Sequence, residues 1–316
     1  MTNVRDLGEA MEREIAKAVI GEAPIVRYLA IALFSSGHVL LEGAPGTAKT
    51  LLAQSFAATL GLDFGRIQFT PDLMPGDIIG SNLFNFQTSS FELTRGPVFC
   101  ELLLADEINR TPPKTQAALL EAMQERSVTI DGRTETLSDR FTVVATQNPI
   151  EQQGVYPLPE AQLDRFLFKL AIDYPDEASE RAIVAQYGAR SGTPRPADSG
   201  VGQIADAQTI AQAIQTVSDV RLVDEIVAYV VALVRATRDH PDLATGASPR
   251  AAAALAGAAR AAAALEGRDY VIPDDVKLLA RPLLRHRVIL SPTAEIDGRR
   301  TDDIVAELID HVEAPR

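Results

Sequence analysis

The sequence predicts an α/β protein in which helices flank a parallel sheet, followed by a smaller, all-helical C-terminal domain. Up to about residue 172, short apolar runs alternate with helical patterns, as in sheets whose parallel strands are joined by crossover helices. Beyond about residue 202 the strand signal fades and alanine-rich helical segments dominate. The chain has 316 residues, more than the ~100–200 typical of one domain. We therefore expect an α/β domain over 1–190 and a helical domain over 200–316, joined by the Gly-, Pro- and Ser-rich stretch 189–202.

Composition and charge narrow the class of protein. Hydrophobic residues make up 46% of the chain and charged residues 23%, ordinary values for a globular protein. The net charge of −13 disfavours nucleic acid or anionic lipid as the main partner, since such binding depends on Lys and Arg. Cys100 is the only cysteine, which excludes an internal disulfide and a cysteine-based metal site. The apolar run 226–234 is far shorter than the ~20 residues of a membrane span. The N-terminus lacks a secretory signal, so we expect a cytoplasmic protein.

Five segments are expected to form the strands of the sheet. Four of them are nearly continuous in apolar residues, which is typical of strands covered on both faces. They are HVLLEG (38–43), CELLLAD (100–106), FTVVATQ (141–147) and RFLFKLAI (165–172), with RIQFT (66–70) as the fifth.

The stretch LEGAPGTAKT, residues 41–50, follows the first strand and resembles a phosphate-binding loop. In the pattern G-x-x-x-x-G-K-[ST], backbone N–H groups surround phosphates, Lys reaches the β and γ oxygens, and the hydroxyl binds Mg²⁺. Gly43, Lys49 and Thr50 match, whereas Ala48 replaces the second glycine. We expect Ala48 to begin the following helix in a right-handed conformation, which costs alanine nothing.

On its own, this loop fits a tight turn with an incidental lysine about as well as a phosphate site. The flanking elements favour the phosphate site. A strand precedes the loop, and TLLAQSFAATLG forms a helix that ends at Gly61, a good residue after a helix C-terminus.

Two segments have the pattern of β-hairpins. Residues 82–96 alternate apolar and polar side chains around TSS. Residues 126–137 do the same around Asp131 and Gly132, a favoured tight-turn dipeptide. From the residues alone, both hairpins could equally be surface elements that have no part in the function.

Polar side chains follow two of the central strands. Asp106 and Glu107 end the strand 100–106, at the sheet edge that holds the phosphate loop. There Asp106 could hold Mg²⁺ together with Thr50, while Glu107 polarises the attacking water. A charged pair that merely ends a strand is the alternative. The strand 141–147 ends in Gln147 and Asn148, whose amide could reach the γ-phosphate, although a simple strand cap explains that pair equally well.

Together these motifs resemble those of the AAA+ P-loop ATPases. In their detailed amino-acid sequence they are similar to the motifs of the MoxR family. The resemblance covers nearly the whole chain. It rests on segments 19–50, 66–80, 96–125, 146–166, 247–251 and 270–288.

The resemblance implies further roles. It makes Asn148 the first sensor, Arg165 an arginine finger for a neighbouring subunit, and Arg250 a second sensor that reaches the nucleotide of its own subunit. Read without it, Arg165 is a solvated helix residue and Arg250 a residue behind the helix cap Ser248. Arg110 is a second candidate for the finger.

The expected nucleotide-binding residues form two groups, the phosphate side and the adenine side. Val19, Ile20 and Gly21 match the family segment that packs on adenine, although they also suit the end of an amphipathic helix. The full set is Gly43, Ala44, Pro45, Gly46, Thr47, Ala48, Lys49, Thr50, Leu51, Asp106, Val19, Ile20 and Gly21, with Thr50 and Asp106 as metal ligands.

The expected function follows from the resemblance. By this resemblance, the hairpins at 82–96 and 126–137 match the helix-2 insert and the hairpin that precedes the first sensor. These mark the helix-2-insert clade, which MoxR proteins share with magnesium chelatase motor subunits. Members of the clade are ring-forming motors, so ATP/ADP and Mg²⁺ are the expected cofactors and a homo-oligomeric ring, most often a hexamer, the expected assembly. The implied output is chaperone-like maturation of a partner, often one with a von Willebrand factor A domain, sometimes with metal or cofactor insertion. Two alternatives are a chelatase- or helicase-like motor and a nucleotide-gated adaptor with little turnover. The histidines, His38, His240, His286 and His311, are expected to be structural because none is spaced for a shared metal.

Overall fold

The computed structural model describes residues 3–87, 89–149, 155–189 and 192–315. Its core is a parallel five-stranded sheet in the order β2-β5-β8-β1-β9. All five expected strands are confirmed: β1 Val39–Gly43, β2 Phe64–Gln68, β5 Leu102–Asp106, β8 Thr142–Gln147 and β9 Phe168–Ile172. Because the strands are parallel, their carboxyl ends share one edge of the sheet.

Helices cover both faces of this sheet, as the apolar strands predict. Successive side chains of β1 enter two different cores: Val39 and Leu41 pack into one, and Leu40 into the other. The first core contains residues of α1 Val4–Ala16, α2 Ala23–Phe34 and α3 Lys49–Leu60, and the second contains residues of α5 Pro113–Glu125. The helices α4 Pro75–Ile79, α6 Glu160–Leu163, α7 Glu177–Tyr187 and α8 Ala207–Ser218, with the 3₁₀ turns η1 Ile108–Arg110 and η2 Pro196–Ser199, complete this part.

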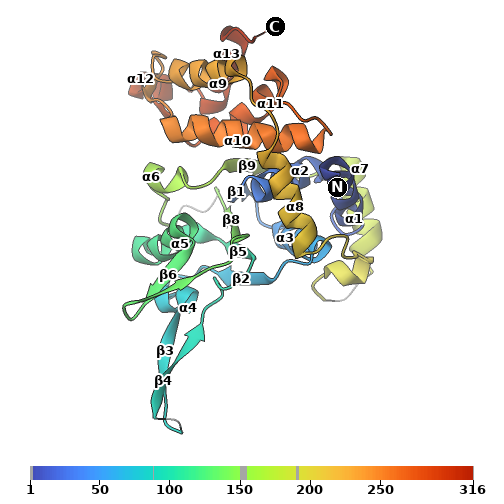
Figure 1. Ribbon diagram of the computed structural model, residues 1–316, viewed down its shortest axis with the longest axis vertical. Helices are drawn as coiled ribbons and strands as arrows, with labels where there is room; N and C mark the ends of the chain where they lie inside the picture. The colour runs from blue at the N-terminus through green and yellow to red at the C-terminus, as the bar shows by residue number, and fades with distance from the viewer. Residues whose placement is uncertain (1–2, 88, 150–154, 190–191, 316) are drawn as a thin grey trace.

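Both expected hairpins are present. The first consists of β3 Gly80–Asn85 and β4 Ser90–Arg95, and it extends far from the sheet (Figure 1). Part of its expected turn, residue 88, lies outside the described residues. The second consists of β6 Ser127–Ile130 and β7 Arg133–Thr136, with φ of 48° at Asp131 and 79° at Gly132, as a tight hairpin turn requires. Asn82 donates a hydrogen bond of 2.9 Å to Asp131, so the two hairpins are in contact.

The C-terminal part is mainly helical and lies at the opposite end of the molecule from the β3–β4 hairpin (Figure 1). In the alanine-rich helix, residues such as Ala258, Ala259 and Ala262 are fully buried, since small side chains allow close helix packing. Its helices are α9 Asp224–Ala236, α10 Pro249–Leu265, α11 Pro273–Leu284, α12 Pro292–Ile296 and α13 Thr301–His311.

The expectation of an all-helical second domain needs one correction. The short strands β10 Leu243–Thr245 and β11 Ile289–Leu290 form an antiparallel pair. Three and two residues are too few to show the alternation by which strands are recognised in sequence.

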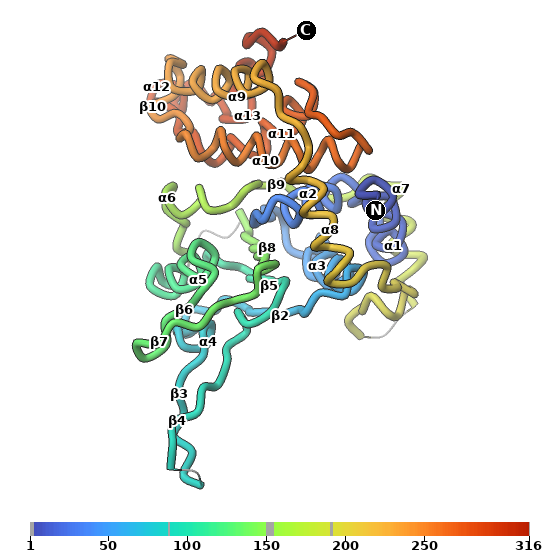
Figure 2. Tube along the Cα trace, viewed as in Figure 1, coloured from blue at the N-terminus to red at the C-terminus, as the bar shows by residue number. Residues whose placement is uncertain are grey.

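The helical part packs directly on the α/β part. Helix α10 faces α1, α2 and α8 (Figure 2), and one hydrophobic core runs from Leu41 through Leu29 to Leu255 without interruption. The stretch 189–202 is not a free linker where it is described: Gly202 donates to Glu14 at 2.9 Å, while residues 190–191 lie outside the described residues. No helix within the described ranges is both long and apolar enough to cross a bilayer.

Candidate functional site

The loop between β1 and α3 lies at the carboxyl edge of the sheet. Two glycines shape it for different reasons. A Cβ on Gly43 would lie 2.4 Å from the carbonyl oxygen of Ile172, so the close approach of β9 requires glycine there. Gly46 has open space around it but a φ of 84°, so its backbone conformation requires glycine.

The prediction for Ala48 was wrong. Ala48 has φ 55° and ψ 19°, the left-handed conformation, and it precedes the first residue of α3. For a residue with a Cβ this conformation costs roughly 1–2 kcal/mol. The pattern's glycine therefore has a conformational reason at this position, and the chain tolerates the strain of alanine.

Lys49 lies at the centre of the loop. Its ammonium donates to the carbonyl oxygens of Gly43 at 2.9 Å and Ala44 at 2.6 Å, and to Thr47 Oγ1 at 3.1 Å. Burial lowers the pKa of Lys49, while the nearby Asp106 and Glu107 carboxylates oppose that shift. The loop thus holds a cation on its inner side, where anionic phosphate oxygens could replace the carbonyl partners.

Asp106 ends β5 beside Thr50, as expected. Thr50 Oγ1 lies 3.5 Å from Asp106 Oδ2, and Thr146 donates to Asp106 Oδ1 at 2.7 Å. A hydroxyl and a carboxylate that converge in this way are the oxygen ligands that Mg²⁺ prefers, so the residues fit the ion. Arg66 also contacts Asp106 Oδ2, at 2.9 Å, and would have to move to admit a metal there.

Glu107 is held in an uncommon conformation. Its φ of 58° and ψ of 49° are left-handed, at a cost of roughly 1–3 kcal/mol of the kind that clusters at functional sites. Its N–H donates to Thr146 Oγ1 at 2.8 Å. Its Oε2 accepts from Gln68 at 2.7 Å and lies 3.3 Å from an Arg110 nitrogen. Arg110 therefore lies at the carboxylates of its own subunit, which does not favour it as a finger for a neighbour.

Sequence reasoning missed Arg66, Gln68 and Thr146. A signal for Gln68 was available, because RIQFT is a strand of the same parallel sheet and its last residues must reach the same edge. Gln68 pairs in register with Asp106. Thr146 lies one residue before the amide pair at the end of β8, where an apolar run hid its role.

Two adjoining cavities flank the loop. The loop cavity, about 370 Å³, lies between Gly43, residues 45–51 and the side chains Asp106, Glu107, Gln147 and Asn148. The side cavity, about 220 Å³, shares the loop residues 46–48 and is bounded by Val19 and Ile20 together with α7 residues that sequence reasoning missed, Ile183 and Tyr187. Polar side chains line much of the loop cavity and apolar ones much of the side cavity, so together they suit a ligand with one polar and one apolar end. Gly21, with φ 87°, packs next to Ser179 and does not line the side cavity.

The amides at the end of β8 lie where they were expected. Asn148 is 8% exposed and lines the loop cavity. Gln147 also lines it and donates to Glu42, which pairs with Lys169 at 2.9 Å.

Arg165 and Arg250 do not line the loop cavity. Both line a third space, the arginine cavity, of about 280 Å³, which also borders Arg126, Arg287 and Asp164. It reaches residues 37 and 38 before β1 and residue 167 before β9, so it lies at the amino edge of the sheet. The five residues of β1 separate the two edges by about 16 Å. Arg250 therefore lies at the opposite sheet edge from the loop cavity of its own subunit, which does not favour the expected role on that subunit's nucleotide.

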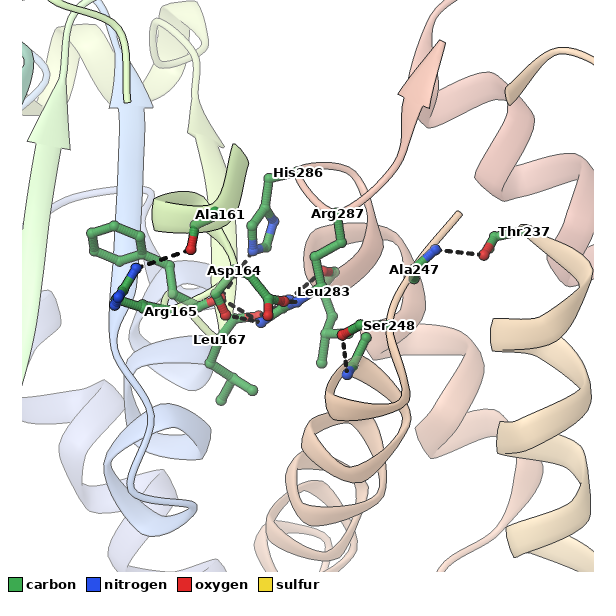
Figure 3. Close-up of polar contacts among 12 residues, drawn as sticks. Ala161, Asp164, Arg165, Leu167, Thr237, Ala247, Ser248, Leu283, His286 and Arg287 are labelled. Carbon is green, nitrogen blue, oxygen red and sulfur yellow. Dashed lines mark hydrogen bonds and ion pairs between the residues drawn. The ribbon is translucent and has the colours of Figure 1, made fainter. Parts of the chain in front are cut away.

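Polar contacts order the wall of the arginine cavity (Figure 3). Arg165 donates to the Ala161 carbonyl at 2.9 Å, and Ser248 caps α10, as expected. His286 is buried, which lowers its pKa well below the usual value, and its Nε2 lies 2.9 Å from the Phe166 carbonyl. His38 is buried as well, with Nδ1 accepting from Val143 at 3.0 Å.

Comparison with known proteins agrees with this geometry. Residues 38–168 match the profile described as "ATPase family associated with various cellular activities (AAA)", and residues 235–308 match an AAA lid domain. The chain is 44% identical to Chaperone MoxR1 of Mycobacterium tuberculosis (96% of this chain, 81% of that protein) and 36% identical to Protein MoxR of Methylorubrum extorquens (100% and 97%). It is 46% identical to the uncharacterized protein YeaC of Bacillus subtilis (98% and 95%). A crystal structure of a proposed ATPase from Cytophaga hutchinsonii superposes with a TM-score of 0.91 at 39% identity, covering 99% of this chain and 96% of the other.

Proposed function

The chain belongs to the MoxR family of AAA+ ATPases, and we propose that it hydrolyses ATP to ADP and phosphate in the loop cavity. One observation carries the proposal: Lys49, Thr50, Asp106 and Glu107 converge on a single cavity at the end of a β-strand. An apolar cavity adjoins it and suits a base, with Val19 and Ile20 as its contacts and Gly21 shaping the backbone beside it.

In this proposal each residue has a separate task. Lys49 exchanges its carbonyl partners for β and γ oxygens, and the N–H groups of residues 44–51 surround the phosphates. Thr50 and Asp106 would hold Mg²⁺, which neutralises charge on the phosphates when it is bound. Glu107 accepts a proton from the attacking water, and the Asn148 amide orients that water or the γ-phosphate.

We infer that the site takes a further cation, an arginine, from outside its own subunit. No arginine is among the described residues that line the loop cavity, while four arginines and one aspartate border the arginine cavity at the other sheet edge. A guanidinium supplied by a neighbour raises turnover by roughly 10³–10⁵ in related phosphoryl-transfer sites. We assign that role to Arg165, together with Arg250, in a head-to-tail ring that is a hexamer.

The proposed output is chaperone-like, an assignment that rests on family analogy. The exposed β3–β4 hairpin presents Phe84, Phe86 and Phe91, which are 43%, 87% and 71% exposed. Apolar rings on an acidic protein suit a protein client better than nucleic acid. A partner with a von Willebrand factor A domain is the client class that the family suggests. The proposed units are an AAA+ domain over 1–190 and a lid over 200–316.

The test compares Glu107→Gln with the wild-type protein. The amide keeps the shape of the side chain but cannot accept the proton, so we expect a fluorescent ATP analogue to bind normally while phosphate release falls at least about 10²-fold. The same variant held in ATP serves as a trap for clients in a pulldown. Normal phosphate release by Glu107→Gln would refute the assignment, and failure of wild-type protein to bind Mg·ATP would refute the site.

A further inference from the structure

We propose that Arg287 of the lid is a positioning residue for Arg165, so that the lid and the arginine finger of one subunit move as a single body. The inference rests on the proposed function, because Arg165 acts there on the nucleotide of the neighbouring subunit. Arg287 would affect turnover only through the residue that it holds in place.

The contacts of Arg287 converge on the segment that carries Arg165 (Figure 3). Its Nε lies 2.7 Å from Asp164 Oδ1, the residue directly before Arg165. Its terminal nitrogens donate to the carbonyl oxygens of Asp164 at 3.1 Å, Phe166 at 2.7 Å and Leu167 at 3.0 Å. One side chain of the lid thus contacts the residues on both sides of the finger.

The neighbours of Arg287 in sequence strengthen the same junction. His286 Nε2 lies 2.9 Å from the Phe166 carbonyl, and Arg285 donates to the Lys169 carbonyl at 3.3 Å. Three consecutive lid residues therefore contact backbone oxygens between residues 164 and 169.

The finger segment has little regular structure to hold it. It follows α6, a helix of four residues, and Arg165 itself donates to the Ala161 carbonyl of that helix. The side chain of Arg287, by contrast, is only 3% exposed. A planar guanidinium that bonds a carboxylate and several carbonyls in one plane fixes direction as well as distance, which an ammonium cannot do.

This arrangement links sites across a subunit boundary. Arg250 belongs to the lid helix α10 and lines the same cavity as Arg165 and Arg287. A change at the neighbour's γ-phosphate that moves either arginine would move the lid with it. The lid of each subunit would then report the nucleotide state of its neighbour.

The first test is a double-mutant cycle of Arg165→Ala and Arg287→Ala, measured as phosphate release at ring-forming concentration. Arg287→Ala alone should lower turnover about 10²-fold, the loss that a misplacement of about 1 Å produces. It should leave nucleotide affinity unchanged, because the loop cavity is at the other sheet edge. The double variant should be no slower than Arg165→Ala. If the double variant loses turnover by the product of the two single-variant losses, the proposal is overturned, since Arg287 would then act independently of Arg165.

A matched control separates positioning from stability. Arg268 forms a comparable ion pair within the lid, at 2.6 Å from Asp275, whose side chain is 6% exposed, and Arg268 does not touch residues 164–167. Arg268→Ala should destabilise the lid but keep turnover below its melting temperature. If Arg268→Ala loses as much turnover as Arg287→Ala, lid stability explains the effect and positioning is overturned. Should Arg287→Ala not fold, Asp164→Asn takes its place in the cycle.

The second test mixes two variants whose turnover is strongly reduced. A Glu107→Gln subunit keeps its arginines, and an Arg287→Ala subunit keeps its hydrolysis site. A random 1:1 ring should regain up to about a quarter of the wild-type rate per subunit, because one interface in four joins the two intact halves. If the mixture does not regain turnover, the proposal that Arg287 affects hydrolysis in a neighbouring subunit is overturned. A mixture of Glu107→Gln with Arg165→Ala tests the proposed function by itself. If that mixture regains turnover and the mixture with Arg287→Ala does not, only the inference about Arg287 fails; if neither regains turnover, the proposed action of Arg165 on a neighbour fails.

Discussion

His38 should make the stability of the protein depend on pH between about 4 and 6.5. Burial lowers the pKa of His38 to about 4, and the nearby Arg126 and Arg250 add to that shift against the opposing hydrogen bond to the Met123 carbonyl. In the unfolded chain the pKa returns to about 6.5. The unfolded chain therefore takes up a proton first as the pH falls. The stabilisation that neutral His38 contributes above pH 6.5 is lost as the pH falls toward 4. The difference of 2.5 units between the two pKa values corresponds to about 3 kcal/mol in the free energy of unfolding.

The assay is urea unfolding at several pH values for wild type and His38→Gln. The amide keeps one donor and one acceptor for Met123 and Val143 but does not titrate. Between pH 6 and 4.5 the wild-type free energy of unfolding should fall more steeply than that of the variant, by about 1.4 kcal/mol per pH unit. Other groups that titrate, His286 among them, are present in both proteins and cancel in the difference. Equal slopes would refute the neutral, buried state of His38.

Three further substitutions test the loop and its carboxylates. Ala48→Gly should raise the free energy of unfolding by about 0.5–1 kcal/mol, because glycine removes the left-handed strain but loses more chain entropy; thermal or urea melts would measure it. Gly43→Ala should destabilise by about 1–3 kcal/mol, since its Cβ would lie 2.4 Å from the Ile172 carbonyl oxygen, and no change in melting would contradict that contact. Arg66→Ala should lower the Mg²⁺ concentration needed for binding of a fluorescent ATP analogue, because it removes a cation from Asp106; an unchanged Mg²⁺ titration would show that Arg66 does not compete with the metal.

Much of the fold was predictable because the strands are apolar throughout. Runs such as CELLLAD do not alternate apolar with polar residues, which is expected of a strand that is covered on both faces of the sheet. The structure confirms this for β5, where Leu102–Ala105 are all buried. The strands β10 and β11 were not predictable, since elements of three and two residues carry no periodicity. The phosphate loop and Asp106 were recognisable because their chemistry depends on residues close in sequence or on a shared sheet edge.

What the sequence could not show was which cavity each arginine enters. Arg250 lies at the start of a lid helix, and its position relative to the sheet depends on how the whole lid docks through contacts such as Arg287 with Asp164. That docking joins residues 123 positions apart, a separation over which local patterns carry no information. The left-handed conformation of Ala48 was missed for a related reason, because the path of the loop between β1 and α3 decides it.

The positions of the two cavities also restrict how copies of the chain can assemble. The phosphate loop is at the carboxyl edge of the sheet, and Arg165 and Arg250 are at the amino edge, so in the proposed mechanism these two arginines act on the site of another copy. A two-fold dimer uses the same patch on both copies. It could complete a site only if that one patch contained both sheet edges, each meeting the opposite edge of the partner. Contact of one edge with the opposite edge of the next copy is head-to-tail, and repeated head-to-tail contact closes into a ring when the rotation per subunit divides a full turn. The proposed ring thus follows from the positions of the loop cavity and the arginine cavity at opposite ends of β1.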